Sequence, residues 1–150
     1  MDKEVKKAYF DKLKDNIDRF GYQLTYVSAP IPFCYSTGIY LTHKIPEIII
    51  SSLPQGICAD IADNYVEAFK TKMAIPLNEP LDFLTDKFAV YLIDVPVSNL
   101  KDYVLSSAKF YEEQPYKYLQ AVYPDTNGNF PTETGYNYDQ ELMGYFIPKI

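Results

Sequence analysis

Apolar positions at helical spacing occupy the start of the chain. They recur at steps of four, four, four and three, as Val5, Tyr9, Leu13, Ile17 and Phe20, and therefore share one face of a helix. With Asp2 as N-cap and Gly21 as C-terminal stop, the pattern predicts a helix over residues 2–20. Because its polar face mixes both signs of charge, we expect the apolar face to pack on the core rather than on a membrane.

Three short segments with period-two alternation follow this helix. Tyr22, Leu24 and Tyr26 alternate with their neighbours and predict a strand over residues 21–28. A second strand is predicted over residues 33–40, where Gly38 indicates a bulge or a close backbone approach, and a polar turn over residues 41–45. A third is predicted over residues 46–53, where three consecutive isoleucines indicate burial on both faces. Their close spacing favours a meander.

Helical and extended patterns alternate in the rest of the chain. Apolar residues at steps of four predict a helix from Pro54 to about Met73. Residues 74–85 predict a loop with a short edge strand, and residues 87–95 a buried strand. Ser98 suits the N-cap of a helix over residues 99–113, and residues 116–123 predict a further strand. After Pro131 we expect mostly loop, with a short β-like segment over residues 142–147.

The order of these elements predicts the α+β class. Strands come together first and then mix with helices, which is typical of one sheet with helices packed on it. We expect a single, mostly antiparallel sheet with about three helices packed mainly on one side. No segment has the composition of a linker, so residues 1–150 are expected to form a single domain.

Three blocks of the sequence carry a family resemblance. The first is Gly21-Tyr22, and the second is residues 33–39 together with Ile45-Pro46-Glu47. The third is residues 119–125, which end in Tyr123-Pro124-Asp125, with Gly128, Phe130 and Pro131 after them. In this order the blocks resemble the pattern of bacterial domain-of-unknown-function family 4262: Gly-Trp, Tyr-Thr-Gly-Leu, His-Pro-Glu, Gln, Trp-Pro-Asp, Gly and Phe-Pro-Trp. The resemblance covers most of the chain and implies a fold but no established activity.

The chain departs from that pattern at specific positions. Tyr22, Tyr123 and Thr132 stand where the pattern has Trp, and Ile45 stands where it has His. Chemistry that needs those rings is therefore not implied for this chain. The segment from Tyr35 to Gly38 is also similar to flavin-reductase-like split barrels, which implies a flavin site as an alternative.

Charge and aromatic content narrow the function classes. The net charge of −6 comes from residues 76–150, which hold eleven acids and five bases, whereas residues 1–75 hold nine of each. This acidity argues against nucleic acid and favours a basic protein as partner, with simple solubility as the other interpretation. Fifteen Tyr and nine Phe suit half-buried positions and contact surfaces.

The cysteines and the first residues bear on location. Cys34 and Cys58 have neither metal nor redox spacing, and residues 1–20 are charged throughout, unlike a signal peptide. The apolar runs are too short to span a membrane. We therefore expect a cytoplasmic protein without a metal, a cofactor or a membrane partner.

Candidate nucleophiles do not indicate a reaction. Ser36, Thr37 and Cys34 would all depend on His43, the single histidine of the chain. The pattern places His43 in a solvated turn, so a structural role is the better interpretation. No phosphate-binding loop occurs.

The candidate carboxylates do not indicate a metal site or a catalytic pair by themselves. The segment from Asp125 to Asn129 begins like a calcium loop, but its glycine and its twelfth residue do not fit. An Asx-type turn is predicted instead. Glu47, Asp125 and Glu133 could form a carboxylate pair only if the fold brings them together.

These features favour a non-catalytic binding protein, such as an acidic inhibitor or immunity protein that covers a basic toxin or nuclease. A flavin- or small-ligand-binding split-barrel-like enzyme and a structural scaffold subunit are the alternatives. Acids would steer the partner, and tyrosines would anchor it. The candidate partner-binding residues are Glu112, Glu113, Tyr116, Tyr118, Asp125, Glu133, Tyr136, Tyr138, Asp139 and Glu141.

Overall fold

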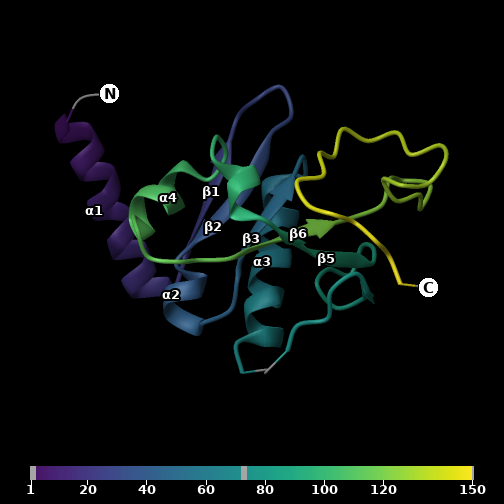
Figure 1. Ribbon diagram of the computed structural model, residues 1–150, viewed down its shortest axis with the longest axis horizontal. Helices are drawn as coiled ribbons and strands as arrows, with labels where there is room; N and C mark the ends of the chain where they lie inside the picture. Colours follow the sequence, from purple (N-terminus) through teal and green to yellow (C-terminus); the bar gives the residue numbers. More distant parts are fainter. Residues whose placement is uncertain (1–2, 72–73, 150) are drawn as a thin grey trace.

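An open sheet of six strands forms the middle of the molecule. The computed structural model describes residues 3–71 and 74–149, and its strands lie in the order β1-β2-β3-β6-β5-β4 (Figure 1). Their bounds are β1 (Gln23–Val27), β2 (Phe33–Thr37), β3 (Glu47–Ser51), β4 (Pro80–Leu81), β5 (Val90–Val95) and β6 (Tyr118–Val122). The first three strands pair antiparallel, as the meander that the sequence predicts.

Four α-helices and one 3₁₀-helix accompany the sheet in the described part of the chain. They are α1 (Lys3–Phe20), α2 (Ile39–His43), α3 (Gln55–Phe69), the 3₁₀-helix η1 (Val97–Leu100) and α4 (Leu105–Tyr111). The α+β class is therefore confirmed. Among the described helices, none is both long and apolar enough to cross a membrane.

The sheet is mixed, so the expectation of a mostly antiparallel sheet is wrong. β6 lies between β3 and β5, parallel to the first and antiparallel to the second. In chain order, α3 leads from β3 to the β4–β5 pair, and η1 and α4 then lead back to β6, which fills the place beside β3. Consecutive strands usually pair, and here the central pair joins strands that are far apart in sequence.

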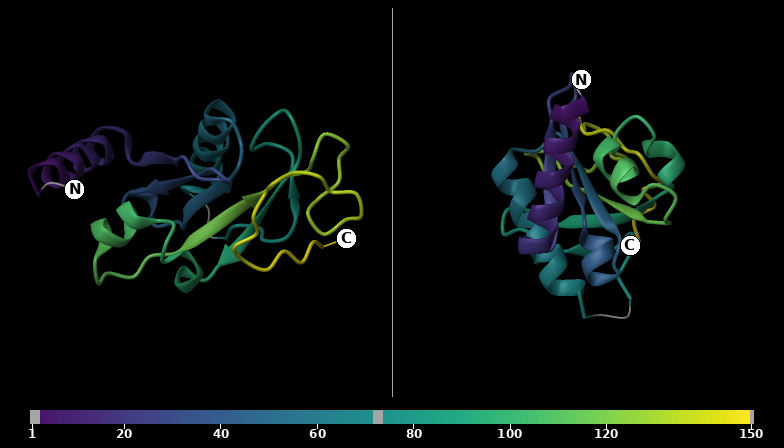
Figure 2. Two further views of the ribbon diagram at one scale, coloured as in Figure 1. Left: turned by 90° about the horizontal axis from the view of Figure 1, so that it is seen from above. Right: turned by 90° about the vertical axis from the view of Figure 1, so that its left-hand side faces the viewer.

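Both faces of the sheet are covered, so the expectation that helices pack mainly on one side is also wrong. Figure 2 shows α3 and α4 on opposite sides of the sheet. Ile48 and Ile50 join the apolar cluster that includes α3, whereas Ile49 joins the cluster of η1, Val104 and the tail residue Phe146. All three isoleucines are fully buried, which confirms the predicted coverage on both faces.

Tyrosine hydroxyls inside the core donate to backbone carbonyl oxygens. Tyr65 donates to the carbonyl of Pro46 at 2.7 Å, and Tyr118 donates to that of Ser36 at 2.5 Å. Both rings are fully buried, and a buried hydroxyl needs such a partner. Part of the high tyrosine content therefore fills the core rather than the surface.

The first helix docks on the sheet through its C-terminal half. Leu13 and Ile17 are buried, but Phe20 of the same predicted face is 71% exposed. Ile17 packs against Gly38, where an added Cβ would lie 2.8 Å from its Cγ1 atom. Gly38 has a φ of 111°, a conformation that favours glycine. Gly38 follows the end of β2, so there is no bulge within the strand, and the alternative prediction of a close approach to its backbone is the one that holds.

Two helical segments differ from the sequence prediction. Residues 39–43 form α2 in place of the predicted strand end and turn. The predicted helix over residues 99–113 is broken: η1 ends at Leu100 and α4 begins at Leu105, without a side-chain N-cap from Ser98. The Ser106 N–H donates to the Tyr35 hydroxyl at 3.0 Å and so fixes α4 by a tertiary contact.

The ends of two other predicted segments also differ. Residues 142–147 form no strand. The predicted helix end at Met73 lies outside the described residues, and α3 ends at Phe69.

Candidate functional site

A cleft lies where the two parallel strands end. β3 and β6 run in the same direction, so the segments that follow them meet at one end of the sheet. With Lys87, Phe88 and residues 137–139 of the tail, these segments line a cleft of about 700 Å³, which we name the strand-end cleft. Ligands of open α/β sheets bind beyond the carboxyl ends of such strands, so the topology makes this cleft the leading candidate site.

Aromatic rings form the apolar part of the strand-end cleft. The ring centroid of Tyr123 lies 5.8 Å from that of Phe88 and 6.4 Å from that of Tyr138. Tyr123 is buried, Phe88 is half-buried and Tyr138 is 40% exposed. Leu53 and Ile57 pack partly buried against the same core cluster as Tyr123. The cleft thus has a packed aromatic floor and an exposed aromatic rim.

Asp125 fixes the loop that closes one side of the cleft. Its Oδ1 atom accepts the N–H groups of Asn127 and Asn129, both at 2.9 Å, and its Oδ2 atom accepts that of Asn137 at 3.2 Å. These bonds confirm the predicted Asx-type turn. Gly128 in this turn has a φ of 84°. Because the carboxylate is buried and bonded to backbone, Asp125 shapes the cleft rather than facing it as a free charge.

A separate acidic hollow of about 350 Å³ lies between α3 and residues 82–86. It is lined by Asp60, Asn64, Asp82, Phe83, Thr85 and Asp86. Ile57 of the cleft precedes Asp60 by about one helical turn, and Lys87 follows Asp86 directly, so the two hollows are neighbours although no residue lines both. Together they present four exposed aspartates (these three and Asp139) against one lysine, Lys87.

Glu47 is a buried carboxylate that fixes the start of α2. Its oxygens accept the backbone N–H groups of Gly38, Ile39 and Tyr40 at 2.9, 3.1 and 3.0 Å. They also accept the hydroxyls of Ser36, at 2.7 Å, and Tyr111. Burial raises the pKa of the Glu47 carboxyl, and these hydrogen bonds oppose that shift. With five donors in place, Glu47 is a structural acceptor.

Glu47 does not form a carboxylate pair with Asp125. Glu47 begins β3, whereas Asp125 lies just beyond the end of β6. Because these strands are parallel, the two carboxylates lie at opposite ends of the sheet. In the described residues, no group of three or more His, Cys, Asp or Glu could hold a metal ion.

The candidate nucleophiles are engaged elsewhere. The Ser36 hydroxyl donates to Glu47 and accepts the Ile48 N–H at 2.9 Å. A hydrogen bond with the Cys58 thiol, together with burial, raises the pKa of Cys34. A reactive thiol needs the opposite shift and exposure. The only carboxylate that Ser36 contacts in the described residues, Glu47, is fully buried with it.

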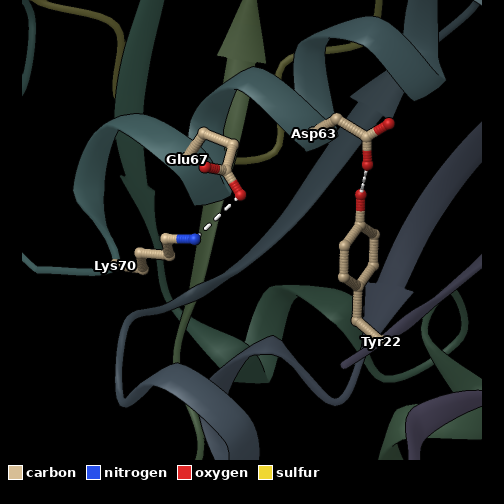
Figure 3. Close-up of polar contacts among 4 residues, drawn as sticks. All are labelled: Tyr22, Asp63, Glu67 and Lys70. Carbon is tan, nitrogen blue, oxygen red and sulfur yellow. Dashed lines mark hydrogen bonds and ion pairs between the residues drawn. The ribbon is translucent and has the colours of Figure 1, made fainter. Parts of the chain in front are cut away.

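A second polar cluster surrounds Tyr22, between α2 and α3. Figure 3 shows the Tyr22 hydroxyl donating to Asp63, and Lys70 pairing with Glu67 at 2.9 Å. Burial and this hydrogen bond raise the pKa of Tyr22. Burial, with Lys70 nearby, lowers the pKa of His43, which lines the same hollow of about 470 Å³. The Tyr22–Asp63 bond ties the start of β1 to α3, whereas Lys70 and Glu67 pair along α3 itself.

The predicted partner-binding residues fall into separate places. Asp125, Tyr138 and Asp139 line the strand-end cleft. Tyr136 is half-buried beside Tyr138, with ring centroids 6.3 Å apart. Glu133 is exposed and accepts a backbone N–H within its own turn. These five residues remain close to the candidate site.

The other predicted residues lie away from the cleft or inside the protein. Glu112 and Glu113 are exposed at the end of α4, which precedes the opposite end of β6. Tyr118 is fully buried, and Tyr116 is half-buried and stacked on a neighbouring ring. Glu141 is half-buried and accepts the Tyr103 hydroxyl at 2.8 Å. Tyr118 therefore serves the core and offers no surface anchor.

The sequence prediction missed the residues that line the two hollows near α3. Phe88, Asp60, Asp82, Asp86 and Lys87 line the two hollows but carried no motif. Their position in the sequence could have indicated them, because residues 82–88 lie directly before a predicted buried strand. Using that signal requires knowing that α3 lies alongside this segment.

Comparison with known families agrees with the resemblance carried by the sequence blocks. The model of the family described as "Domain of unknown function (DUF4262)" matches residues 16–137, so the chain belongs to this family. No curated protein and no solved structure matches the chain.

Proposed function

We propose that this member of the DUF4262 family is a non-catalytic binding protein that covers a basic partner, as an inhibitor or immunity protein does. The observation that carries the proposal is the aromatic strand-end cleft with the acidic hollow beside it. The cleft is lined by the block Tyr123-Pro124-Asp125 with Gly128, which is also the third block of the family resemblance.

The aromatic rim supplies the anchor in this proposal. Interface energy concentrates in a few aromatic or Arg side chains that lie in well-packed pockets. Tyr138 is 40% exposed and rests against Tyr123 and Tyr136, so little rotamer freedom is lost when a partner covers it. Its hydroxyl end stays available to the partner's polar groups.

Charge supplies the steering. The cleft and hollow carry Asp60, Asp82, Asp86 and Asp139 as exposed acids, with Lys87 as the one base among their lining residues. A surface concavity of one sign raises the association rate of a partner of opposite sign. A basic loop or tail is the partner chemistry that fits.

The engagement of the candidate nucleophiles supports the non-catalytic part. Ser36 and Glu47 bind each other and the backbone of α2, while His43 packs beside Gly21 on another element. Ser36 and Glu47 are both fully buried, whereas a nucleophile and its base must be open to the substrate. A flavin enzyme stays a prediction, although the sheet is open rather than a split barrel; visible absorption of the purified protein tests it.

Binding kinetics at two salt concentrations test the proposal, with the protein encoded beside this chain as the probe. Asp82→Lys with Asp86→Lys should slow association and flatten its salt dependence, whereas Tyr138→Ala should speed dissociation by about tenfold or more. Glu112→Lys with Glu113→Lys is the charge-matched control, and Tyr145→Ala, at a side chain 77% exposed outside the cleft, is the control for Tyr138. Equal effects of cleft and control variants would refute the proposed site.

A further inference from the structure

We infer that the part of the partner that enters the strand-end cleft is a polyproline II segment with an arginine a few residues beyond its prolines. This inference rests on the proposed function and names the chemistry of the segment that the cleft takes. It draws on the aromatic floor, the separation of the two hollows and the position of the cleft relative to the strands.

The aromatic part of the cleft suits proline rings. Phe88 is half-buried and Tyr138 is 40% exposed, so these two rings offer surface, and both pack on the buried ring of Tyr123, with centroids 5.8 and 6.4 Å away. Pro54 and Pro124 add rigid apolar walls. Aromatic-lined grooves of this kind hold polyproline II segments, which have no internal hydrogen bonds and lose little entropy on binding.

Donors at the rim can meet the carbonyls that such a segment leaves free. The Tyr138 hydroxyl and the Asn137 side chain line the cleft, and both residues are exposed. Neither side chain makes a hydrogen bond within the described residues. A polyproline II backbone presents carbonyl oxygens outward and few N–H groups, so donors rather than acceptors are the groups it needs.

The distance between the two hollows sets the place of the basic residue. Ile57 lines the cleft, and Asn64, seven residues further along the same helix, lines the acidic hollow. Seven residues of α-helix span about 10 Å, which corresponds to about three residues of polyproline II at 3.1 Å each. Asp60, Asp82 and Asp86 line the hollow with Asn64, and carboxylates favour the planar fork of Arg.

Strand addition is the competing mode, and the position of the cleft disfavours it. The cleft lies beyond the ends of β3 and β6, which are both interior strands of the sheet. A peptide that adds a strand needs a free edge with unpaired N–H and C=O groups. The edges of this sheet are β1 and β4, and neither borders the cleft.

Fluorescence anisotropy with synthetic peptides tests the inference. The probe is a short labelled peptide in which a run of prolines is followed, about three residues on, by an arginine. Its matched forms replace the prolines by alanines, or the arginine by glutamate. Each replacement should weaken binding by about tenfold, and Tyr138→Ala should do the same while Tyr145→Ala does not.

Two outcomes separate this inference from the proposed function. If the alanine form with the arginine binds as tightly as the proline form, the polyproline II inference is overturned and a basic-segment cleft stands. If no peptide binds, while the neighbouring basic protein binds through Tyr138 and Asp82, the inference also falls and the function stands. Loss of both binding events, with the chain folded, overturns both.

Discussion

Replacing Glu47 by glutamine keeps the shape of the side chain and removes the carboxylate that five donors share. Oε1 accepts Ile39 N–H and the Ser36 hydroxyl, while Oε2 accepts Gly38 N–H, Tyr40 N–H and the Tyr111 hydroxyl. An amide has one oxygen and one NH₂ group. Whichever way it turns, its NH₂ group meets at least one backbone N–H that cannot reverse its direction.

The size of the stability loss follows from the more favourable of the two ways in which the glutamine amide can be placed. With NH₂ in the place of Oε1, the Ile39 N–H loses its acceptor inside a fully buried site. An unsatisfied buried donor costs about 1–3 kcal/mol, and the bonds that remain lose the charge that strengthened them, about 1 kcal/mol more. We expect Glu47→Gln to lower the free energy of unfolding by about 2–4 kcal/mol.

Urea unfolding near neutral pH measures this loss as a shift of the midpoint at constant slope. Tyr111→Phe removes one donor and leaves the carboxylate its other four bonds, so we expect about 1–2 kcal/mol there. Glu113→Gln, at an exposed position, should stay within about 0.5 kcal/mol of the unchanged protein. The reasoning fails if Glu47→Gln costs no more than Tyr111→Phe.

Further outcomes follow from other positions. Gly144→Ala would place a Cβ 2.2 Å from the Asp94 carbonyl oxygen, so we expect it to lower the free energy of unfolding in urea by about 1–3 kcal/mol. Gly56→Ala is the control, because a Cβ there would meet nothing within 4 Å, and it should be neutral or stabilising. Equal effects of the two variants would contradict the close approach at Gly144. Asp125→Ala removes the acceptor of three backbone N–H groups, and Gly128→Val puts a β-branched residue at a positive φ. Each variant should lower the free energy of unfolding by about 1–3 kcal/mol. An unchanged melting temperature together with lost partner binding would instead make the turn a direct contact with the partner. Folding lowers the pKa of His43, so the stability that His43 contributes is fully present above about pH 6.5 and is lost as the pH falls through its pKa in the folded protein. His43→Asn should remove this loss of stability at low pH. Parallel stability–pH profiles of the variant and the unchanged protein would refute this role of His43. A single cooperative calorimetric transition is expected of one domain, and two resolved peaks would count against it.

Local patterns in the sequence predicted the elements whose stability is local. The three isoleucines of β3 indicated burial on both faces, and both faces are covered. The short polar residues after Pro124 predicted an Asx-type turn, and Asp125 makes it. In each case the residues that form the structure lie within a few positions of one another, so their spacing carries the information.

The elements that the sequence missed depend on distant partners. α2 replaces a predicted turn because Glu47, from the next strand, accepts the N–H groups of Gly38, Ile39 and Tyr40. α4 stands apart from η1 because its serines bond to the sheet; the Ser107 hydroxyl contacts that of Thr37 at 2.6 Å. The place of β6 between β3 and β5 is likewise a long-range pairing, to which periodicity gives no access.

The acidic residues of the second half of the chain do not form one acidic surface. Glu112 and Glu113 precede the start of β6, while Asp139 and the cleft lie beyond its end. The five residues of β6 span about 17 Å, which exceeds the screening length of about 8 Å at physiological salt. The two groups of acids therefore act separately on a partner at the cleft. Asp60, from the neutral first half, lines the acidic hollow and contributes more to its field than Glu112 does. Reversal of Asp60 should accordingly slow association with a basic partner more than reversal of Glu112, and the opposite order would place the partner at α4 instead of the cleft.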